Sequence, residues 1–261
     1  MIYRFNPTGL LYNSTEEANT SQSYDLELII KNGVLSQSNP LPLTKFKPKD
    51  GWIESIEPEE HLDKIANNIR ILLGDSKLKV LCLSYKDISL ANRISNNISP
   101  KQIIFDKKIG IGGNFIEEYD EADVINILKN INYRYDLIIA RHYIEHFDNA
   151  EIIINELNNI LTEKGFLFIE VPDCKQFIDQ GNPLFLWEQH RKYFTENSIK
   201  HMFNIFHYKI KAEWVINYEL EPSLCYLLGR NNNIENKLTY NSEIIEVNEK
   251  EFKTKFNSYI T

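Results

Sequence analysis

The chain has 261 residues, of which 43% are hydrophobic, enough to bury the core of one α/β domain of ordinary size with extensions. Its formal net charge of -8 and its isoelectric point near 5.4 argue against binding to nucleic acid or to an anionic membrane, because both favour a basic surface. No stretch approaches the roughly 20 apolar residues that span a bilayer, and the N-terminal MIYRFNPTG lacks the apolar core of a signal peptide, so we expect a cytoplasmic protein.

Residues 1–57 are predicted to form an arm outside the main domain. They mix polar stretches with a proline-spaced segment, and we expect a helix around Tyr24 to Asn32. The main domain is predicted to cover residues 58–230. The tail at 231–261 is polar and can carry a terminal helix.

Within the main domain, strands are predicted to alternate with helices. An amphipathic helix is expected from Leu62 to Leu73, ending at Gly74. Asp148 and Glu151 have the spacing of a capping signature for a later helix that Gly165 would stop. Four buried strands are predicted at 79–84, 101–106, 135–140 and 166–171, with helices over 88–98, 124–130 and from 148, and a final hairpin at 208–218 and 221–230. This order predicts a mostly parallel sheet with helices on both faces.

Two segments carry the strongest functional signal, YDLIIARHYIEHF at 135–147 and GFLFIEVPD at 165–173. Each is an apolar run that ends in polar residues, at the sheet edge where open α/β proteins bind ligands. Their spacing resembles strands four and five of class I S-adenosylmethionine (SAM)-dependent methyltransferases, in which an "EH" and an "E-x-P" recur. The resemblance implies a Rossmann-like fold that uses SAM and releases S-adenosyl-L-homocysteine.

The resemblance also implies where the cofactor would bind. The family usually has a glycine-rich loop after its first strand, whereas this chain has none there. Ser84 replaces the first glycine, and Asp87 stands where many relatives have an acidic residue. Asp106 closes the second strand and would accept the ribose hydroxyls, and Arg141 and His142 complete the expected cofactor contacts. The glycine-free loop leaves a second hypothesis open, a domain that has lost its cofactor and serves as a binding or scaffold partner.

The string His142-Tyr-Ile-Glu145-His146 also matches H-x-x-E-H, an inverted zinc-peptidase motif. That motif needs a helix to bring its two histidines together, whereas this copy directly follows a predicted strand. The three cysteines are far apart and form no C-x-x-C pair, so neither a zinc ribbon nor a disulfide framework is indicated. We therefore expect no metal, and stoichiometric zinc in the purified protein would overturn this interpretation.

The segment NPLFLWEQHRKYFT, at 182–195, resembles the "YHEH-x-x-YF" segment of the sugar C-methyltransferases, whose N-terminal zinc module is missing here. Trp187 and Gln189 stand where that family has tyrosine and glutamate. The resemblance implies His190 as the catalytic base, with His146 as an alternative or as a phosphate contact. Trp187, Arg191 and Tyr193 are the expected substrate contacts. Packing in a half-buried loop is the alternative interpretation for both histidines.

The basic residues Arg141, Arg191 and Lys192 suit an anionic small molecule, although they are equally consistent with solvated surface charge. We therefore expect methylation of a phosphorylated or nucleotide-linked metabolite, with a sugar of surface-glycan or secondary-metabolite assembly as the leading candidate. Loss of the family's tyrosine and glutamate favours methylation of oxygen over carbon, because carbon deprotonation needs a strong local base. No nucleic-acid or membrane partner is expected, and a homodimer is left open.

Overall fold

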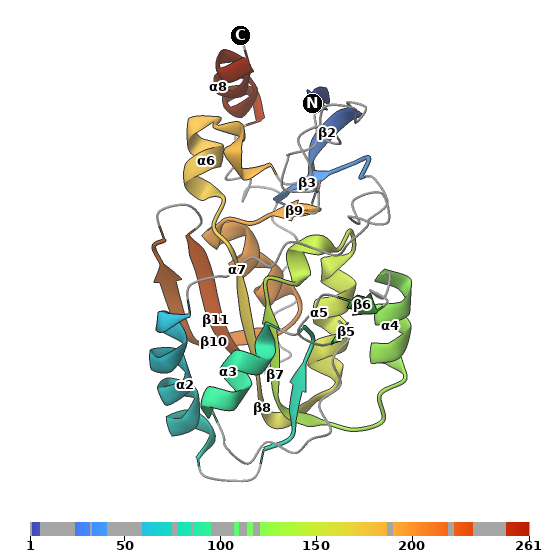
Figure 1. Ribbon diagram of the computed structural model, residues 1–261, viewed down its shortest axis with the longest axis vertical. Coiled ribbons are helices and arrows are strands. Elements are labelled where there is room, and N and C mark those ends of the chain that lie inside the picture. Colours follow the sequence, from blue (N-terminus) through green and yellow to red (C-terminus); the bar gives the residue numbers. More distant parts are fainter. Residues whose placement is uncertain are drawn as a thin grey trace.

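A computed structural model describes residues 2–5, 24–31, 33–40, 59–74, 78–84, 86–94, 107–109, 114–116, 121–186, 190–218, 222–231 and 249–260. Its centre is a five-stranded sheet with helices on both faces (Figure 1). A smaller sheet lies beyond the end of the main sheet at which β7 and β8 finish (Figure 1). Among the described helices, none combines the length and apolar character needed to cross a membrane.

The main sheet has the strand order β10-β11-β8-β7-β4. The strands β4 (Val80–Cys82), β7 (Tyr135–Arg141) and β8 (Leu161–Pro172) run parallel to one another. The last two strands, β11 (Ser223–Arg230) and β10 (Tyr208–Ile216), form the antiparallel hairpin that closes this side of the sheet. The predicted Rossmann-like α/β fold is confirmed, although the predicted strand at 101–106 lies outside the described residues.

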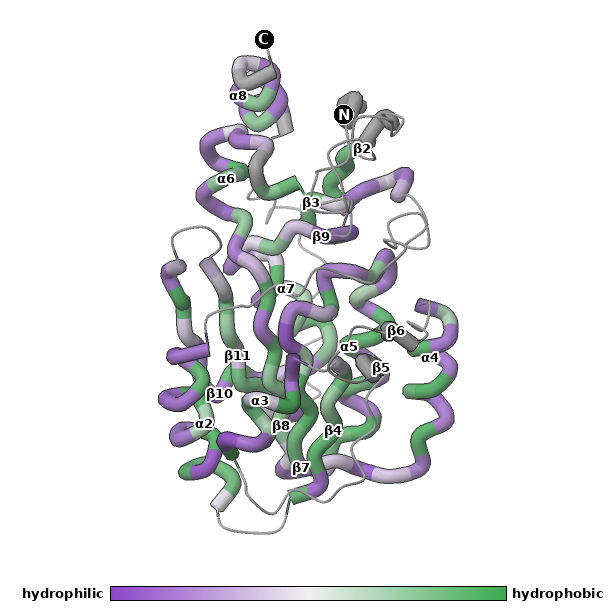
Figure 2. Tube along the Cα trace, in the orientation of Figure 1, coloured by the Kyte–Doolittle hydropathy of each residue, from purple (hydrophilic) through white to green (hydrophobic). Residues whose placement is uncertain are grey.

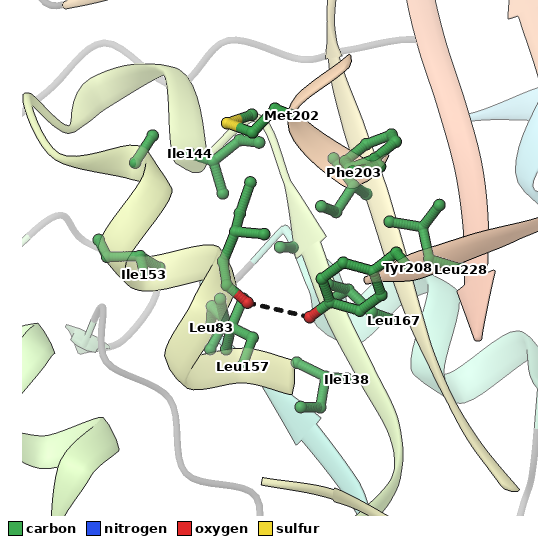
Figure 3. Packing of buried hydrophobic residues seen from close by; sticks show 14 of the residues in the cluster. Leu83, Ile138, Ile144, Ile153, Leu157, Leu167, Met202, Phe203, Tyr208 and Leu228 are labelled. Carbon is green, nitrogen blue, oxygen red and sulfur yellow. Dashed lines mark hydrogen bonds between the residues drawn. The ribbon is translucent and has the colours of Figure 1, made fainter. Parts of the chain in front are cut away.

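Alternating side chains of the strands build one hydrophobic core on each face. The helices α2 (Glu60–Leu73) and α3 (Asp87–Ile94) cover one face, packing on Leu137, Ile139 and Phe168 among others. The helices α4 (Glu121–Lys129), α5 (Ala150–Asn159) and α7 (Glu196–Ile205) cover the other. Figure 2 shows the strands as mostly hydrophobic and the outer helices as mixed. Figure 3 shows part of the second core, where the Tyr208 hydroxyl donates a hydrogen bond of 3.0 Å to the Ile154 carbonyl.

Two details of the α5 segment differ from the sequence prediction. The cap of α5 is Asn149, and it makes no side-chain capping bond. The Glu121 carboxylate of α4 instead accepts the backbone N–H groups of Asp148 and Asn149, each at 2.8 Å. The helix ends before Gly165, which lies inside β8. A Cβ there would be 2.8 Å from the Tyr135 carbonyl, so this glycine lets the two strands approach closely.

The helix predicted around Tyr24 to Asn32 is wrong, because this segment forms a strand. The four-stranded sheet joins β1 (Ile2–Phe5), β2 (Tyr24–Lys31), β3 (Val34–Gln37) and β9 (Lys192–Tyr193), all antiparallel. Gly33 has a φ of 76°, and the Asn-Gly dipeptide at 32–33 is a strong hairpin signal. The spacing of Leu26 and Leu28, two residues apart, and this turn signal both favour a strand over the predicted helix.

The remaining elements lie around these two sheets. The short helices η3 (Ile144–His146), α6 (Lys175–Gln180) and η4 (Pro183–Phe185) follow β7 and β8 in the chain, and β5 (Lys107–Ile109) pairs with β6 (Asn114–Ile116). The terminal helix α8 (Glu249–Ile260) confirms the helix expected in the tail. Its Phe252 and Phe256 join a third hydrophobic cluster with α6 and the small sheet. The domain boundaries at 57 and 230 stay predictions.

Candidate active site

The first feature of the sheet edge is a buried carboxylate that connects the ends of β4 and β7. Asp87, at the start of α3, is completely buried. Its Oδ2 accepts the N–H groups of Leu83 and Ser84 at 2.8 and 2.7 Å, and its Oδ1 accepts the N–H of Arg141 at 2.8 Å. Burial raises the pKa of Asp87 to about 7, against the lowering effect of these three donors. Asp87 therefore holds the loop after β4 against β7.

The loop after β4 presents one polar atom that fits a ligand. Ser84 is 3% exposed, and within the described part of the chain its Oγ has no hydrogen-bond partner. A buried hydroxyl is costly unless it is paired, so a polar group of a bound molecule would stabilise it. Asp106, the expected ribose contact, lies outside the described residues.

A second feature is a chain of ionisable groups on the α2 side of the sheet. Arg141 and Glu170 face each other on β7 and β8, both 1% exposed, with Nε and Oε2 2.5 Å apart. Glu170 Oε1 lies 3.0 Å from Nε2 of His61 and 3.4 Å from Nε2 of His142. The other ring nitrogen of His61 lies 2.7 Å from the Tyr218 hydroxyl. Burial would raise the pKa of Glu170, but hydrogen bonds from both histidines and the Arg141 charge hold it well below its usual range.

Sequence reasoning missed the parts that His61, Glu170 and Tyr218 play in this network. Glu170 was visible as part of the "E-x-P" string but was assigned no contact. A usable signal was the strand period of two: Arg141 and Glu170 continue the rows of Ile139 and Phe168, and so must face α2. His61 could not be found in this way, because a histidine in the first turn of a helix is ordinary.

The third feature is a pair of histidines from distant parts of the chain. His146 ends η3 and His190 precedes β9, and their ring centroids lie 5.0 Å apart in an edge-to-face arrangement. Hydrogen bonds to main-chain carbonyls fix both segments: Arg191 N donates to the Glu145 carbonyl at 2.7 Å, and the Gln37 side-chain Nε2 donates to the His190 carbonyl at 2.6 Å. Burial, together with the charges of His146, His142 and Lys86, lowers the pKa of His190 well below its usual range.

The HYIEH segment does not have the geometry of the zinc-peptidase motif. His142 has a φ of 44°, in the left-handed region that helices do not use, and only one 3₁₀ turn follows it. Its Nδ1 lies 3.7 Å from Glu145 Oε1, and its backbone N–H donates to the Glu170 carbonyl at 2.8 Å. The segment is thus a turn at the end of β7, in agreement with the sequence-based expectation.

The expected cations and substrate contacts are buried. Arg141, Arg191 and Lys192 are at most 5% exposed, so their interpretation as solvated surface charge is wrong. Arg141 is paired with Glu170, and Lys192 Nζ lies 3.4 Å from Glu151 Oε1. Tyr193 is fully buried, accepts a hydrogen bond from Gln37 Nε2 at 3.0 Å and packs in the third hydrophobic cluster. Trp187 and Gln189 lie outside the described residues.

Comparison with known proteins places this arrangement in context. Residues 53–212 match the family described as a methyltransferase domain. No curated protein matches the chain at a significant level. Among solved structures, a SAM-dependent methyltransferase from Clostridium acetobutylicum is 11% identical, with 67% of this chain and 93% of that chain covered and a TM-score of 0.44.

Two further solved structures show likenesses of the same size. The N-methyltransferase NodS from Bradyrhizobium japonicum is 10% identical, covering 67% of this chain and 99% of its own, with a TM-score of 0.41. Magnesium protoporphyrin IX methyltransferase from Synechocystis, crystallised with bound S-adenosylhomocysteine, is 12% identical. The match covers 66% of this chain and 83% of that chain, with a TM-score of 0.41.

Proposed function

This chain belongs to the methyltransferase domain family, and from that premise we propose that it transfers a methyl group from SAM to a small anionic metabolite. The observation that carries the proposal is the site at the ends of β4 and β7. There the buried Ser84 hydroxyl has no hydrogen-bond partner among the described residues, and Asp87 holds the surrounding backbone in place. The site lies at the carboxyl edge of the parallel strands, where α/β sheets bind ligands.

The residues present fit such a cofactor. Bound SAM would supply a methyl group on a sulfonium centre, and in-line attack of the acceptor on this methyl carbon would break the C–S bond and release S-adenosylhomocysteine. Ser84 would donate to or accept from the cofactor, Asp106 would accept its ribose hydroxyls, and His142 would lie against it. Arg141 pairs with Glu170, and Asp87 accepts the backbone N–H of Arg141. These two residues would therefore position the loops that bind the cofactor, without contacting it themselves.

Removal of the acceptor's proton is assigned to the histidine pair. Because burial holds the pKa of His190 well below neutrality, its imidazole is uncharged at pH 7 and has a lone pair available. His146, at its side, would accept the proton in its place or bind a phosphate of the acceptor. Arg191 is the cation proposed to contact the anionic group.

The acceptor class is a phosphorylated or nucleotide-linked metabolite, with a sugar of surface-glycan assembly as the leading candidate. Oxygen is the preferred atom, because a hydroxyl needs only one neutral base whereas a carbon needs a stabilised enolate. The described site offers imidazoles rather than a strong base, which supports this order.

Titration calorimetry of the full chain with SAM and with S-adenosylhomocysteine tests the proposal. We expect one site per chain for both ligands. Ser84→Leu, which fills the space at the end of β4, should weaken the binding of both by at least about tenfold, whereas Ser258→Ala, on α8, should not. A wild-type chain that binds neither ligand would reject the proposal in favour of a binding or scaffold domain.

A further inference from the structure

Three side chains that commonly bind metals meet at the edge of the sheet. They are Glu145 and His146 from η3 and His190 from the segment before β9. One possible ligand atom of each lies within 4.8 Å of the others. The bond from Arg191 N to the Glu145 carbonyl joins the two segments directly, so the main chain itself brings the three groups together.

We propose that Glu145, His146 and His190 bind one divalent transition-metal ion, with Zn²⁺ as the ion that the donor set favours. Two imidazoles and one carboxylate are a ligand set of catalytic zinc sites, which leave a fourth position open. Magnesium and calcium prefer sites made of oxygen alone, and are disfavoured by the two imidazoles.

Burial and charge support the site. Glu145 is fully buried, and metal coordination is one of the ways in which buried carboxylates are stabilised in proteins. Its Oε1 lies 3.7 Å from Nδ1 of His142. A divalent ion among the three ligands would add positive charge beside this carboxylate. His146 is partly exposed, so the open position has a route to solvent.

The use of this ion rests on the proposed methyl transfer, whereas its binding does not. The open position would take an oxygen of the acceptor, from a hydroxyl or a phosphate. A bound Zn²⁺ lowers the pKa of a coordinated hydroxyl, so the ion would promote loss of the acceptor's proton. In the metal-bound protein the lone pair of His190 binds the metal and cannot accept a proton. His190 can therefore act as the base only in the metal-free protein.

From the sequence no metal is expected, because the zinc-peptidase motif lacks its helix here, and the proposed site is a different one. His190 replaces His142 as a ligand, and Glu145 is a ligand instead of a base, which makes the proposal testable. The motif would use His142 and His146, with Glu145 as a base. The structure places His142 against Glu170 and brings His190 to His146 in its place. Removal of His142 and removal of His190 should therefore have different effects on metal binding.

The test uses the full chain, stripped with a chelator and dialysed against Zn²⁺, with metal content measured by elemental analysis. We expect one zinc per chain, and in a Co²⁺-loaded sample the visible absorption of a four-coordinate site. His190→Ala and His146→Ala should each weaken zinc binding by at least about 100-fold, because even partners that only orient a ligand contribute 10- to 100-fold. The zinc affinity of His142→Ala should stay within about tenfold of the wild type. His61→Ala, in the other group of described residues whose side chains could hold a metal, should bind zinc as the wild type does.

Three outcomes would overturn the proposal: a wild-type chain that binds no stoichiometric zinc, an equal loss in His142→Ala and His190→Ala, or a loss in His61→Ala. If a variant does not fold, the zinc-dependent rise in the melting temperature of His190→Gln replaces its binding measurement. The rise should be present in the wild type and absent in this variant. Zinc binding without methyl transfer would contradict only the proposed function, and full methyl transfer by a chain that binds no zinc would contradict only this inference.

Discussion

Two regions of the sheet edge differ in how their charged and polar groups are paired. On the α2 side, Arg141, Glu170 and His61 form a closed network with separations of 2.5 and 3.0 Å. On the η3 side, His146 and His190 place two imidazoles next to each other. Removal of one partner from a buried pair of opposite charges is costly because the other charge is left unpaired, whereas two adjacent imidazoles repel each other when both are protonated. The first region therefore has the character of a support, and the second that of a reactive site.

The largest expected effect tests the supporting role of the first region. Glu170→Ala leaves the buried Arg141 guanidinium without its carboxylate, so we expect the free energy of unfolding to fall by about 3–5 kcal/mol. Urea denaturation measures it. Lys175→Ala, which breaks the exposed pair with Asp179, is the control and should change stability by less than about 1 kcal/mol. Equal effects in the two variants would contradict the comparison.

A smaller effect tests the reactive role of the second region. His190→Ala should reduce the rate of methyl transfer in the metal-free protein by about 100-fold, the contribution of a positioned general base. Its free energy of unfolding should change much less than that of Glu170→Ala. A rate within a few fold of the wild type would show that His190 only packs in its loop.

Asp87 accepts the backbone N–H of Arg141 in the first region, and its titration gives a pH-dependent test. Its pKa is raised by burial from an ordinary value of 3.8 to about 7 in the folded protein. The stability contributed by the protonated carboxyl is therefore fully present below pH 3.8 and is lost as the pH rises through 7. We expect the stability difference between wild type and Asp87→Asn to decrease from pH 4.5 to 7.5. A difference that rises with pH would show that the three N–H donors outweigh burial.

The smallest expected effect tests whether Tyr218 contributes to the network of Arg141, Glu170 and His61. Tyr218→Phe removes the hydroxyl that lies 2.7 Å from His61, at the outer end of the network. We expect a loss of about 1 kcal/mol in stability, as for a single hydrogen bond. Calorimetric melting measures it. A loss as large as that of Glu170→Ala would place Tyr218 at the centre of the network.

The sequence predicted the main sheet because its strands are long apolar runs separated by helices with a clear apolar stripe. The segment around Leu28 was misassigned as a helix, since a short apolar run is ambiguous between a helix and a strand. The meeting of His146 with His190 was suggested by family resemblance, but their contact depends on main-chain bonds between distant segments. Local patterns contain no information on such bonds, and the same holds for the approach of His61 to Glu170.

The pairing of β3 with β9, and the bonds from Gln37 to His190 and Tyr193, have a practical consequence for work with shortened chains. A fragment cut to residues 53–212 would retain the family match but lose β3, Gln37 and β11. It would expose one edge of β9 and one edge of β8, and unpaired strand edges promote aggregation. Recombinant material of that length should therefore be insoluble or inactive for a reason unrelated to its catalytic residues.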